Sequence, residues 1–289
     1  MSLKSKLEAN EFIVTSEIGP PKGIALDKII EEIMPIKNRV DAINVTDLQS
    51  AVMRLGSLAS CVILKQNGFE PVVQFTCRDR NRLALQSDLL SAAAFGLENV
   101  LALTGDHPSL GDHPQAKPVY DIDSVHLVDM ARCLRQGFDA GGHKLSEPFP
   151  KFCIGAVVNP GADPLEPEII KMEKKMAAGA EFFQTQAIYD IAVFERFLCA
   201  CRHLNPRILA GIVYLKSERM ARYMNENVPG VVVPDEVIAQ IARVEDKKNM
   251  SIEISVRLAT ELKKMCQGIH LMPIGWYALT PVVLDSIGK

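Results

Sequence analysis

The chain has 289 residues, of which 48% are hydrophobic and 23% are charged, and its formal net charge is −3. The near balance of 32 basic and 35 acidic residues offers no broad positive surface for nucleic acid. No apolar run approaches the ~18 residues that cross a bilayer, and residues 1–12 carry charges where a secretory signal has an apolar stretch. The sequence therefore predicts a compact, cytoplasmic protein without a membrane span.

The seven cysteines are odd in number and irregularly spaced, which argues against a disulfide framework in a chain of this size. Cys199 and Cys201 are separated by one residue, whereas zinc and redox motifs commonly have two between their cysteines. On a helix these two side chains would point about 200° apart. We expect this pair, and also Cys77 and Cys153, to be buried and inert thiols.

Eight short apolar or β-branched runs follow one another along the chain. They occupy residues 12–18, 42–46, 71–77, 99–104, 152–159, 181–187, 207–214 and 268–275. Most are apolar on both faces, as parallel strands covered by helices are. Amphipathic stretches such as 26–38, 82–96 and 168–180 lie between them, and Gly96 and Gly179 fall where such helices would end.

This alternation predicts a single (β/α)₈ TIM barrel over residues 1–289, closed by a helix within 279–288. An open doubly wound sheet is the alternative, but EIGPPKG after the first strand is not its GxGxxG fingerprint. Two stretches, 105–123 and 137–150, are expected to be irregular. No Pro- or Ser-rich linker divides the chain.

Polar residues gather at the C-terminal ends of the predicted strands, where the active sites of such barrels lie. They are Glu17, Thr46, Asp47, Gln74, Thr76, Thr104, Gly105, Asp106, Asn159, Gln184, Gln186 and Tyr214. Polar groups are costly to bury without partners, so several at one end of successive strands predict a shared polar pocket.

Two carboxylates stand out in this set. Glu17 lies in an apolar strand before Gly-Pro-Pro, where burial would favour a protonated carboxyl suited to general acid catalysis. The alternative is a carboxylate paired with a lysine. Asp106 begins the loop after the fourth strand, where it would either cap a turn or stabilise a cationic intermediate.

Gln184 and Gln186 project to one side of their strand, because side chains repeat every second residue. An amide both donates and accepts, which matches the edge of a pterin or flavin ring. The alternative is a hydrogen-bonded layer inside the barrel. His107, His113 and His126 lack the spacing of metal ligands, so no metal site is predicted.

Five blocks in this order resemble methylenetetrahydrofolate reductase: SEIGPPKG, INVTD, QFTCRDRNR, LALTGDHP and GAEFFQTQAIYD. The resemblance covers about residues 11–288. It implies a TIM barrel that holds a flavin at the C-terminal ends of its strands and reduces 5,10-methylenetetrahydrofolate to 5-methyltetrahydrofolate. In that reaction flavin N5 passes hydride to a 5-iminium cation, whose formation needs a proton at N10.

The resemblance also implies roles for particular residues. Glu17 matches the general acid, Asp106 the aspartate beside the flavin, and Gln186 the glutamine that binds the pterin; Gln184 is grouped with it as substrate-binding. The flavin-contact positions, besides Asp106, are Thr46, Gln74, Thr104, Gly105, Tyr120, Asn159 and Lys175.

Several positions depart from the family pattern. Thr104 replaces an arginine, Gln74 a histidine and Asn159 a tyrosine, while MPIGW at 272–276 replaces a segment with another arginine. Because fewer cations face the cofactor phosphate and the folate tail, FMN is left open in place of FAD. The pattern is similar to the short reductases of acetogens, which receive electrons through a partner subunit. The donor is therefore either NAD(P)H or such a partner, and we expect an oligomer.

Two other functions remain open at this point. One is a flavin-free TIM-barrel methyltransferase that binds methyltetrahydrofolate. The other is a subunit that is active only with its electron-delivering partner.

Overall fold

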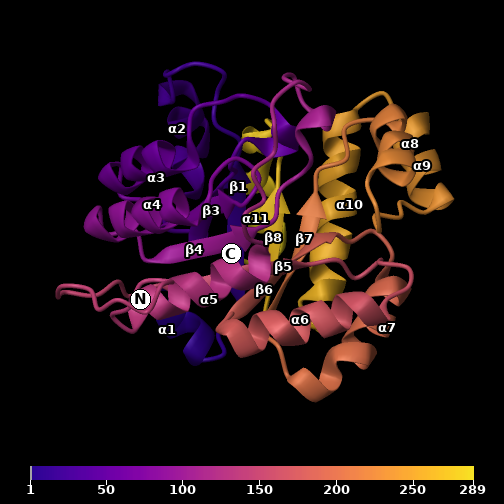
Figure 1. Cartoon of the computed structure of the whole chain (residues 1–289). Coiled ribbons are helices and arrows are strands. Elements are labelled where there is room, and N and C mark those ends of the chain that lie inside the picture. The colour runs from indigo at the N-terminus through magenta and orange to yellow at the C-terminus, as the bar shows by residue number, and fades with distance from the viewer. Residues whose placement is uncertain (1) are drawn as a thin grey trace.

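The computed structural model describes residues 2–289 and contains a closed barrel of eight parallel strands, each paired with the next and β8 with β1 (Figure 1). The strands are β1 (Ile13–Ile18), β2 (Ala42–Val45), β3 (Pro71–Thr76), β4 (Asn99–Leu103), β5 (Cys153–Val158), β6 (Phe182–Ala187), β7 (Ile208–Val213) and β8 (Gly268–Met272). The predicted TIM barrel is confirmed, and each strand lies within one of the eight predicted runs.

The helices surround the barrel, and their order follows the predicted alternation (Figure 1). They are α1 (Leu3–Glu8), α2 (Asp27–Ile33), α3 (Ser57–Gln66), α4 (Arg82–Ala94), α5 (Ser124–Arg135), α6 (Glu166–Ala178), α7 (Ile191–Cys201), α8 (Glu218–Asn227), α9 (Asp235–Arg243), α10 (Lys247–Leu262) and α11 (Thr280–Ser286). Short 3₁₀ turns are η1 (Met34–Ile36), η2 (Gln49–Ala51), η3 (Pro108–Leu110), η4 (Arg202–Leu204) and η5 (Tyr277–Leu279).

Two features were not predicted. Three helices rather than one, α8 to α10, separate β7 from β8, and α10 packs against both strands. The other feature is α1, which precedes the barrel and lies at its lower end in Figure 1. The expected irregular stretches are present: 105–123 contains only η3, and 137–150 contains one isolated bridge, Phe138 to Lys144.

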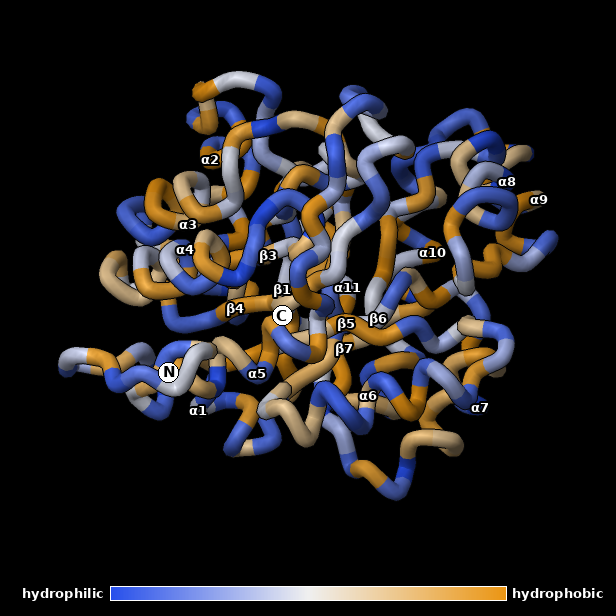
Figure 2. Tube along the Cα trace, in the orientation of Figure 1, coloured by the Kyte–Doolittle hydropathy of each residue, from blue (hydrophilic) through white to orange (hydrophobic). Residues whose placement is uncertain are grey.

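The apolar core has two parts. The larger lies between the strands and the surrounding helices, and hydrophobic colouring accordingly follows the strands and inner helix faces in Figure 2. The smaller joins Leu3 and Leu7 of α1 to one inward residue from each of seven strands: Ile13, Ala42, Val72, Leu101, Cys153, Phe182 and Leu209. In β8 this position is Gly268, where a Cβ would come within 2.6 Å of Leu209. Helix α1 thus plugs the N-terminal end of the barrel.

The cysteines correct one prediction. Cys77, Cys153 and Cys201 are buried as expected, but Cys199 is exposed. It lies two residues from Cys201 on α7, so the two thiols point to opposite sides of the helix. Burial raises the pKa of Cys77 and Cys153 to about 12 and that of Cys201 to about 11, so the buried thiols are unreactive.

Within residues 2–289, no helix is both long and apolar enough to cross a membrane.

Candidate active site at the barrel mouth

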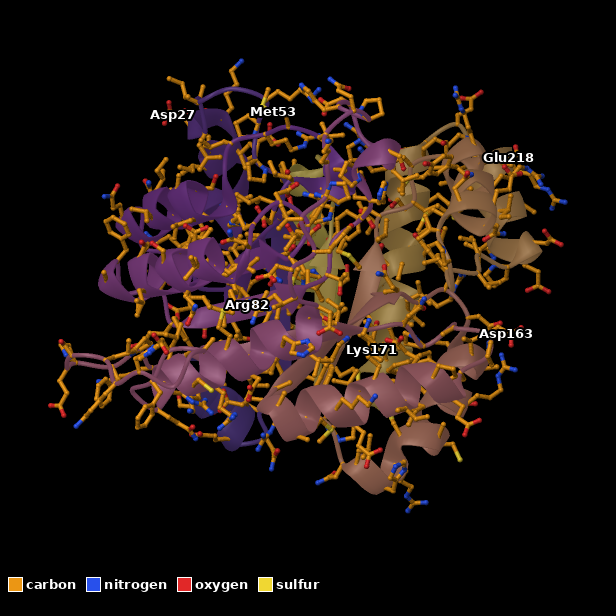
Figure 3. All side chains as sticks on the ribbon, viewed as in Figure 1. Asp27, Met53, Arg82, Asp163, Lys171 and Glu218 are labelled. Carbon is orange, nitrogen blue, oxygen red and sulfur yellow. The ribbon has the colours of Figure 1, made fainter. Side chains whose placement is uncertain are left out.

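All eight strands run in the same direction, so their C-terminal ends meet at one mouth, opposite the end that α1 plugs. In Figure 3, Met53 follows β2 and Glu218 begins α8 after β7, and both lie on the side of the molecule away from α1. The loops that carry the predicted site residues surround this mouth.

Glu17 lies near the end of β1, with its side chain 11% exposed. Its Oε2 accepts a hydrogen bond from Gln74 Nε2 on β3 at 3.3 Å, and His270 Nε2 on β8 lies 3.5 Å from the same oxygen. No lysine pairs with this carboxyl among the ion pairs of residues 2–289. The carboxyl therefore lies in a nearly enclosed polar setting with an opening toward the mouth, as a general acid requires.

A buried polar layer lies directly beneath Glu17. Its members, Thr15, Asn44, Gln184 and His270, each stand two residues after a residue of the layer at the plugged end. Asn44 Nδ2 donates to Gln184 Oε1 at 2.7 Å, and Gln184 Nε2 donates to Asn44 Oδ1 at 3.2 Å and to Thr15 Oγ1 at 3.4 Å. His270 Nδ1 lies 2.8 Å from Thr15 Oγ1.

The two glutamines of β6 differ in their surroundings, because only Gln184 belongs to this layer. Gln184 is buried and its amide is bonded to protein groups, so the structure favours the hydrogen-bonded layer for this residue. Gln186 is exposed at the mouth, beside a break in the register between Gln184 and Ala187. Substrate binding by Gln186 stays a prediction, and it now has the better placement of the two.

The end of β4 forms a second side of the mouth. Gly105 has a φ of +90°, and a Cβ there would meet the Thr76 side chain at 3.0 Å. Tyr120 donates its hydroxyl hydrogen to the Gly105 carbonyl at 3.0 Å, and Thr104 donates to Ser124 at 3.2 Å. The Asp106 carboxylate is exposed, so it is free to face a bound group.

A hollow of about 390 Å³ opens beside this strand end, lined by Thr104, Tyr120, Asp121, Ile122, Asp123 and His126. Its lining includes two predicted flavin contacts, Thr104 and Tyr120. Burial raises the pKa of the Tyr120 phenol, so this hydroxyl is a hydrogen-bond donor at neutral pH.

Arg78, which no local sequence pattern distinguishes, holds this rim together. Its side chain is 2% exposed and pairs with Asp79 at 2.8 Å. The guanidinium also donates at 3.3 Å to two carbonyls, those of Leu48 after β2 and Asp106 after β4. One buried arginine thus fixes the backbone of three neighbouring loops, including the one that carries Asp106.

Thr46 and Asp47 follow β2, and only the Asp47 side chain has hydrogen-bond partners. Asp47 Oδ2 accepts from the Thr76 amide at 2.8 Å and from its hydroxyl at 3.0 Å, and it pairs with Arg80. Thr46 Oγ1, by contrast, is buried with no hydrogen-bond partner. Because an unpaired buried hydroxyl is unfavourable, this atom is a natural contact for a bound molecule.

Two further predicted flavin contacts are engaged with the protein. Lys175 is buried on α6 and donates to the Val157 carbonyl at 2.5 Å; burial lowers its pKa to about 8. The Asn159 side chain donates to the Pro229 carbonyl at 2.8 Å and accepts from the Gly161 amide at 3.2 Å, so it joins the loop after β5 to the segment after α8. Their contact with a flavin stays a prediction.

The three histidines after β4 bond to neighbouring side chains of their own loop or helix start: His107 to Ser109, His113 to Asp112 and His126 to Asp123. Among residues 2–289, no three histidine, cysteine, aspartate or glutamate side chains are grouped as metal ligands would be.

The fold and this site define a TIM barrel with a plugged lower end and a carboxyl-bearing polar mouth. The sequence model of the family described as methylenetetrahydrofolate reductase matches residues 2–288. The chain therefore belongs to the methylenetetrahydrofolate reductase family.

Individual relatives are distant. Methylenetetrahydrofolate reductase 2 of Schizosaccharomyces pombe is 27% identical over 216 residues, which are 68% of this chain and 32% of the yeast protein. The 5,10-methylenetetrahydrofolate reductase of Pectobacterium carotovorum is 25% identical over 174 residues, 58% of this chain and 52% of that protein. The matches span only 24% to 36% of the length of the eukaryotic relatives from Caenorhabditis elegans, fission yeast and maize.

Solved structures support the fold. A protein from Clostridium thermocellum superposes on this chain with a TM-score of 0.69 at 17% identity. The superposition covers 99% of this chain and 100% of the other, which is described as binding two copies of 5-methyl-5,6,7,8-tetrahydrofolic acid. A 2,3-dimethylmalate lyase follows with a TM-score of 0.55 at 10% identity, covering 99% of this chain and 81% of its own.

Proposed function

We propose that this chain catalyses the flavin-dependent reduction of 5,10-methylenetetrahydrofolate to 5-methyltetrahydrofolate. The observation that carries the proposal is the Glu17 carboxyl, which faces the barrel mouth from β1 between a Gln74 donor and a histidine ring. In a member of this family, this position supports Glu17 as the proton donor of the reaction.

The residues present fit a flavin at the mouth. The buried and unpartnered Thr46 hydroxyl is available to a polar atom of the ring system. On the other side, Gly105 has no side chain that would block a bound ring. The hollow lined by Thr104 and Tyr120 is open to the rest of the cofactor. When bound, the flavin would supply the hydride for the one-carbon unit of the substrate.

The protein groups supply the other parts of the reaction. Protonated Glu17 would deliver its proton to N10, which opens the five-membered ring and leaves a positively charged iminium at N5. The exposed Asp106 carboxylate would stabilise that charge. Gln186, exposed at the end of β6, would orient the pterin through its amide.

The phosphate end of the cofactor is the weaker part of the fit. Thr104 stands where the family has an arginine, and the buried Lys175 amine already donates to a carbonyl. We therefore propose FAD, the usual cofactor of the family, with FMN as the alternative. The mass of the molecule released on denaturation distinguishes them.

The direct test separates the two half-reactions. Purified protein should be yellow, its flavin should be reduced by NAD(P)H or by reduced viologen, and the reduced protein should convert 5,10-methylenetetrahydrofolate. A reduced flavin that is not reoxidised by this folate in stopped-flow would refute the proposed function. Reduction by viologen but not by NAD(P)H would indicate the electron-delivering partner.

One observation favours a second candidate. The Clostridium thermocellum protein, similar over its whole length, is described as a binder of methyltetrahydrofolate. A flavin-free methyltransferase or folate-binding protein would be colourless after purification and would still bind 5-methyltetrahydrofolate in calorimetry. A yellow protein excludes this candidate.

A further inference from the structure

A buried histidine lies directly behind the proposed general acid. His270 stands in the middle of β8 and is 2% exposed, while Glu17 is 11% exposed. Its Nε2 is 3.5 Å from Glu17 Oε2, and its Nδ1 is 2.8 Å from Thr15 Oγ1. Thr15 and His270 are paired across β1 and β8, so Nδ1 of the ring is hydrogen-bonded to Thr15 while Nε2 faces the Glu17 carboxyl on the same strand.

The layer beneath sets the direction of the hydrogen bond between Thr15 and His270. The reciprocal pair of Asn44 and Gln184 leaves one Gln184 N–H to donate to Thr15 Oγ1. Among the hydrogen bonds of residues 2–289, the Thr15 hydroxyl has only Gln184 and His270 as partners, and Gln184 is the donor in the first pair, so the hydroxyl hydrogen finds its acceptor at His270 Nδ1. The ring proton then lies on Nε2 and points toward the Glu17 carboxyl.

We propose that His270 is a positioning residue for the general acid, a role that rests on the proposed function. Its Nε2–H holds the Glu17 carboxyl in its place at the mouth, together with Gln74 on the opposite side. When the proton of Glu17 moves to substrate N10, the O–H bond breaks, an N–H bond forms, and the carboxylate left behind keeps the hydrogen bond from Nε2–H. His270 keeps its own proton throughout.

The difference in exposure explains why His270 positions rather than relays. A relay would need its own route to solvent, but the ring is enclosed by Thr15, Glu17 and the strands around it. Glu17 opens to the mouth and can recover its proton there after each turnover. The histidine is therefore a fixed donor, oriented by Thr15 in the way that a second partner orients many catalytic histidines.

The first test needs no turnover. In ¹⁵N-histidine NMR of the free protein, with the His270 signals assigned by their loss in His270→Gln, the ring should be neutral with its proton on Nε2. Glu17→Gln should move the Nε2 signal, and Thr15→Val should disturb the tautomer where Thr15→Ser preserves it. A proton on Nδ1, or signals that do not respond to Glu17→Gln, would overturn the proposal whatever reaction the protein catalyses.

The second test reads the effect on chemistry. His270→Leu should slow the folate half-reaction by about 10- to 100-fold, the range expected for losing one hydrogen bond to a charged group, while flavin reduction by viologen keeps its rate. His270→Gln, whose amide can place an N–H near the former Nε2, should recover most of that loss. Equal rates in the two variants, with both folded by circular dichroism, would contradict the positioning role.

The two failures are distinguishable. If wild-type protein does not reduce the folate, the proposed function fails, and the NMR arm still decides whether His270 donates to Glu17. If wild type is active but the Leu and Gln variants behave alike, only the positioning role fails.

Discussion

The two ends of the barrel interior are built from the same strands but from different kinds of side chain. At the plugged end, seven strands contribute residues such as Ile13 and Phe182, all packed under α1. Two residues further along β1, β2, β6 and β8, the interior side chains are polar, with Thr15, Asn44 and His270 bonded to one another or to Gln184. One short stretch of strand therefore carries both a packed base and a polar mouth.

The difference indicates a division of labour. Apolar packing at the base stabilises the barrel without directional demands, and Gly155 shows how close it is, because a Cβ there would meet the Phe182 ring at 2.3 Å. The polar layer above it requires every donor to find an acceptor, which fixes orientations that a proton donor needs. Changes at the base should therefore alter stability, and changes at the mouth should alter chemistry.

The largest expected effect is at the mouth. Glu17→Gln removes the proton donor, so the folate half-reaction should slow by about 10²- to 10⁴-fold, whereas flavin reduction, which needs no proton at N10, should keep its rate. Stopped-flow absorbance of the flavin measures both steps. Equal slowing of both would show that Glu17 holds the cofactor rather than the proton.

Phe182→Ala makes the opposite change at the base. Phe182 is fully buried, so truncation should lower the free energy of unfolding by about 3–5 kcal/mol. Urea denaturation measures the loss. Below the unfolding transition, both half-reactions should stay within about threefold of wild type, because no predicted site residue lies in this layer; a large loss of folate reduction would break the proposed division.

Lys175 adds a test of the comparison between base and mouth, because its amine is a buried charge near the mouth. Its folded pKa of about 8 lies below the 10.5 of an exposed lysine, so the unfolded chain binds more protons between these values. The free energy of unfolding should therefore rise with pH through this window, by up to about 3 kcal/mol at 1.36 kcal/mol per pKa unit.

Lys175→Met should remove this rise and be the more stable protein at pH 7. Lys174→Met, at the exposed neighbouring position, should leave the pH dependence unchanged. Urea midpoints at pH 7, 9 and 10 give the comparison. Parallel pH profiles in wild type and Lys175→Met would mean that the amine is not buried as a charge.

The strands and much of the mouth were predictable because local pattern determines them. Short apolar or β-branched runs located all eight strands, and closing them into a barrel brings Glu17 and the loop of Asp106 to the same end. No long-range knowledge was needed, since the C-terminal end of every parallel strand lies at that mouth.

The buried roles of His270 and Arg78 were not predicted, because they depend on partners far away in the chain. His270 sits in an apolar strand, and its partner Thr15 is 255 residues away, so no local pattern distinguishes an inward polar histidine from a packed one. Arg78 follows β3 like any solvent-facing arginine, and only the carbonyls of two other loops make it a buried one. Helix α1 has six residues, too short for a periodic signal.

The smallest effect tests whether the two ends open independently. Cys153 lies in the base layer and Cys77 at the end of β3 near the mouth; both are buried, with pKa values of about 12, so at pH 8 each reacts with a thiol reagent only after local opening. Cys199→Ser removes the exposed thiol that would otherwise react first. In that background, Leu7→Ala loosens the plug.

If α1 protects only the base, Leu7→Ala should speed the labelling of Cys153 by about tenfold or more and leave Cys77 nearly unchanged, because an opening confined to one unit does not expose the other. Mass spectrometry of peptides after timed labelling reads the two rates separately. Equal acceleration of both thiols would mean that the barrel opens as one unit, so that the packed base and the polar mouth share a single stability.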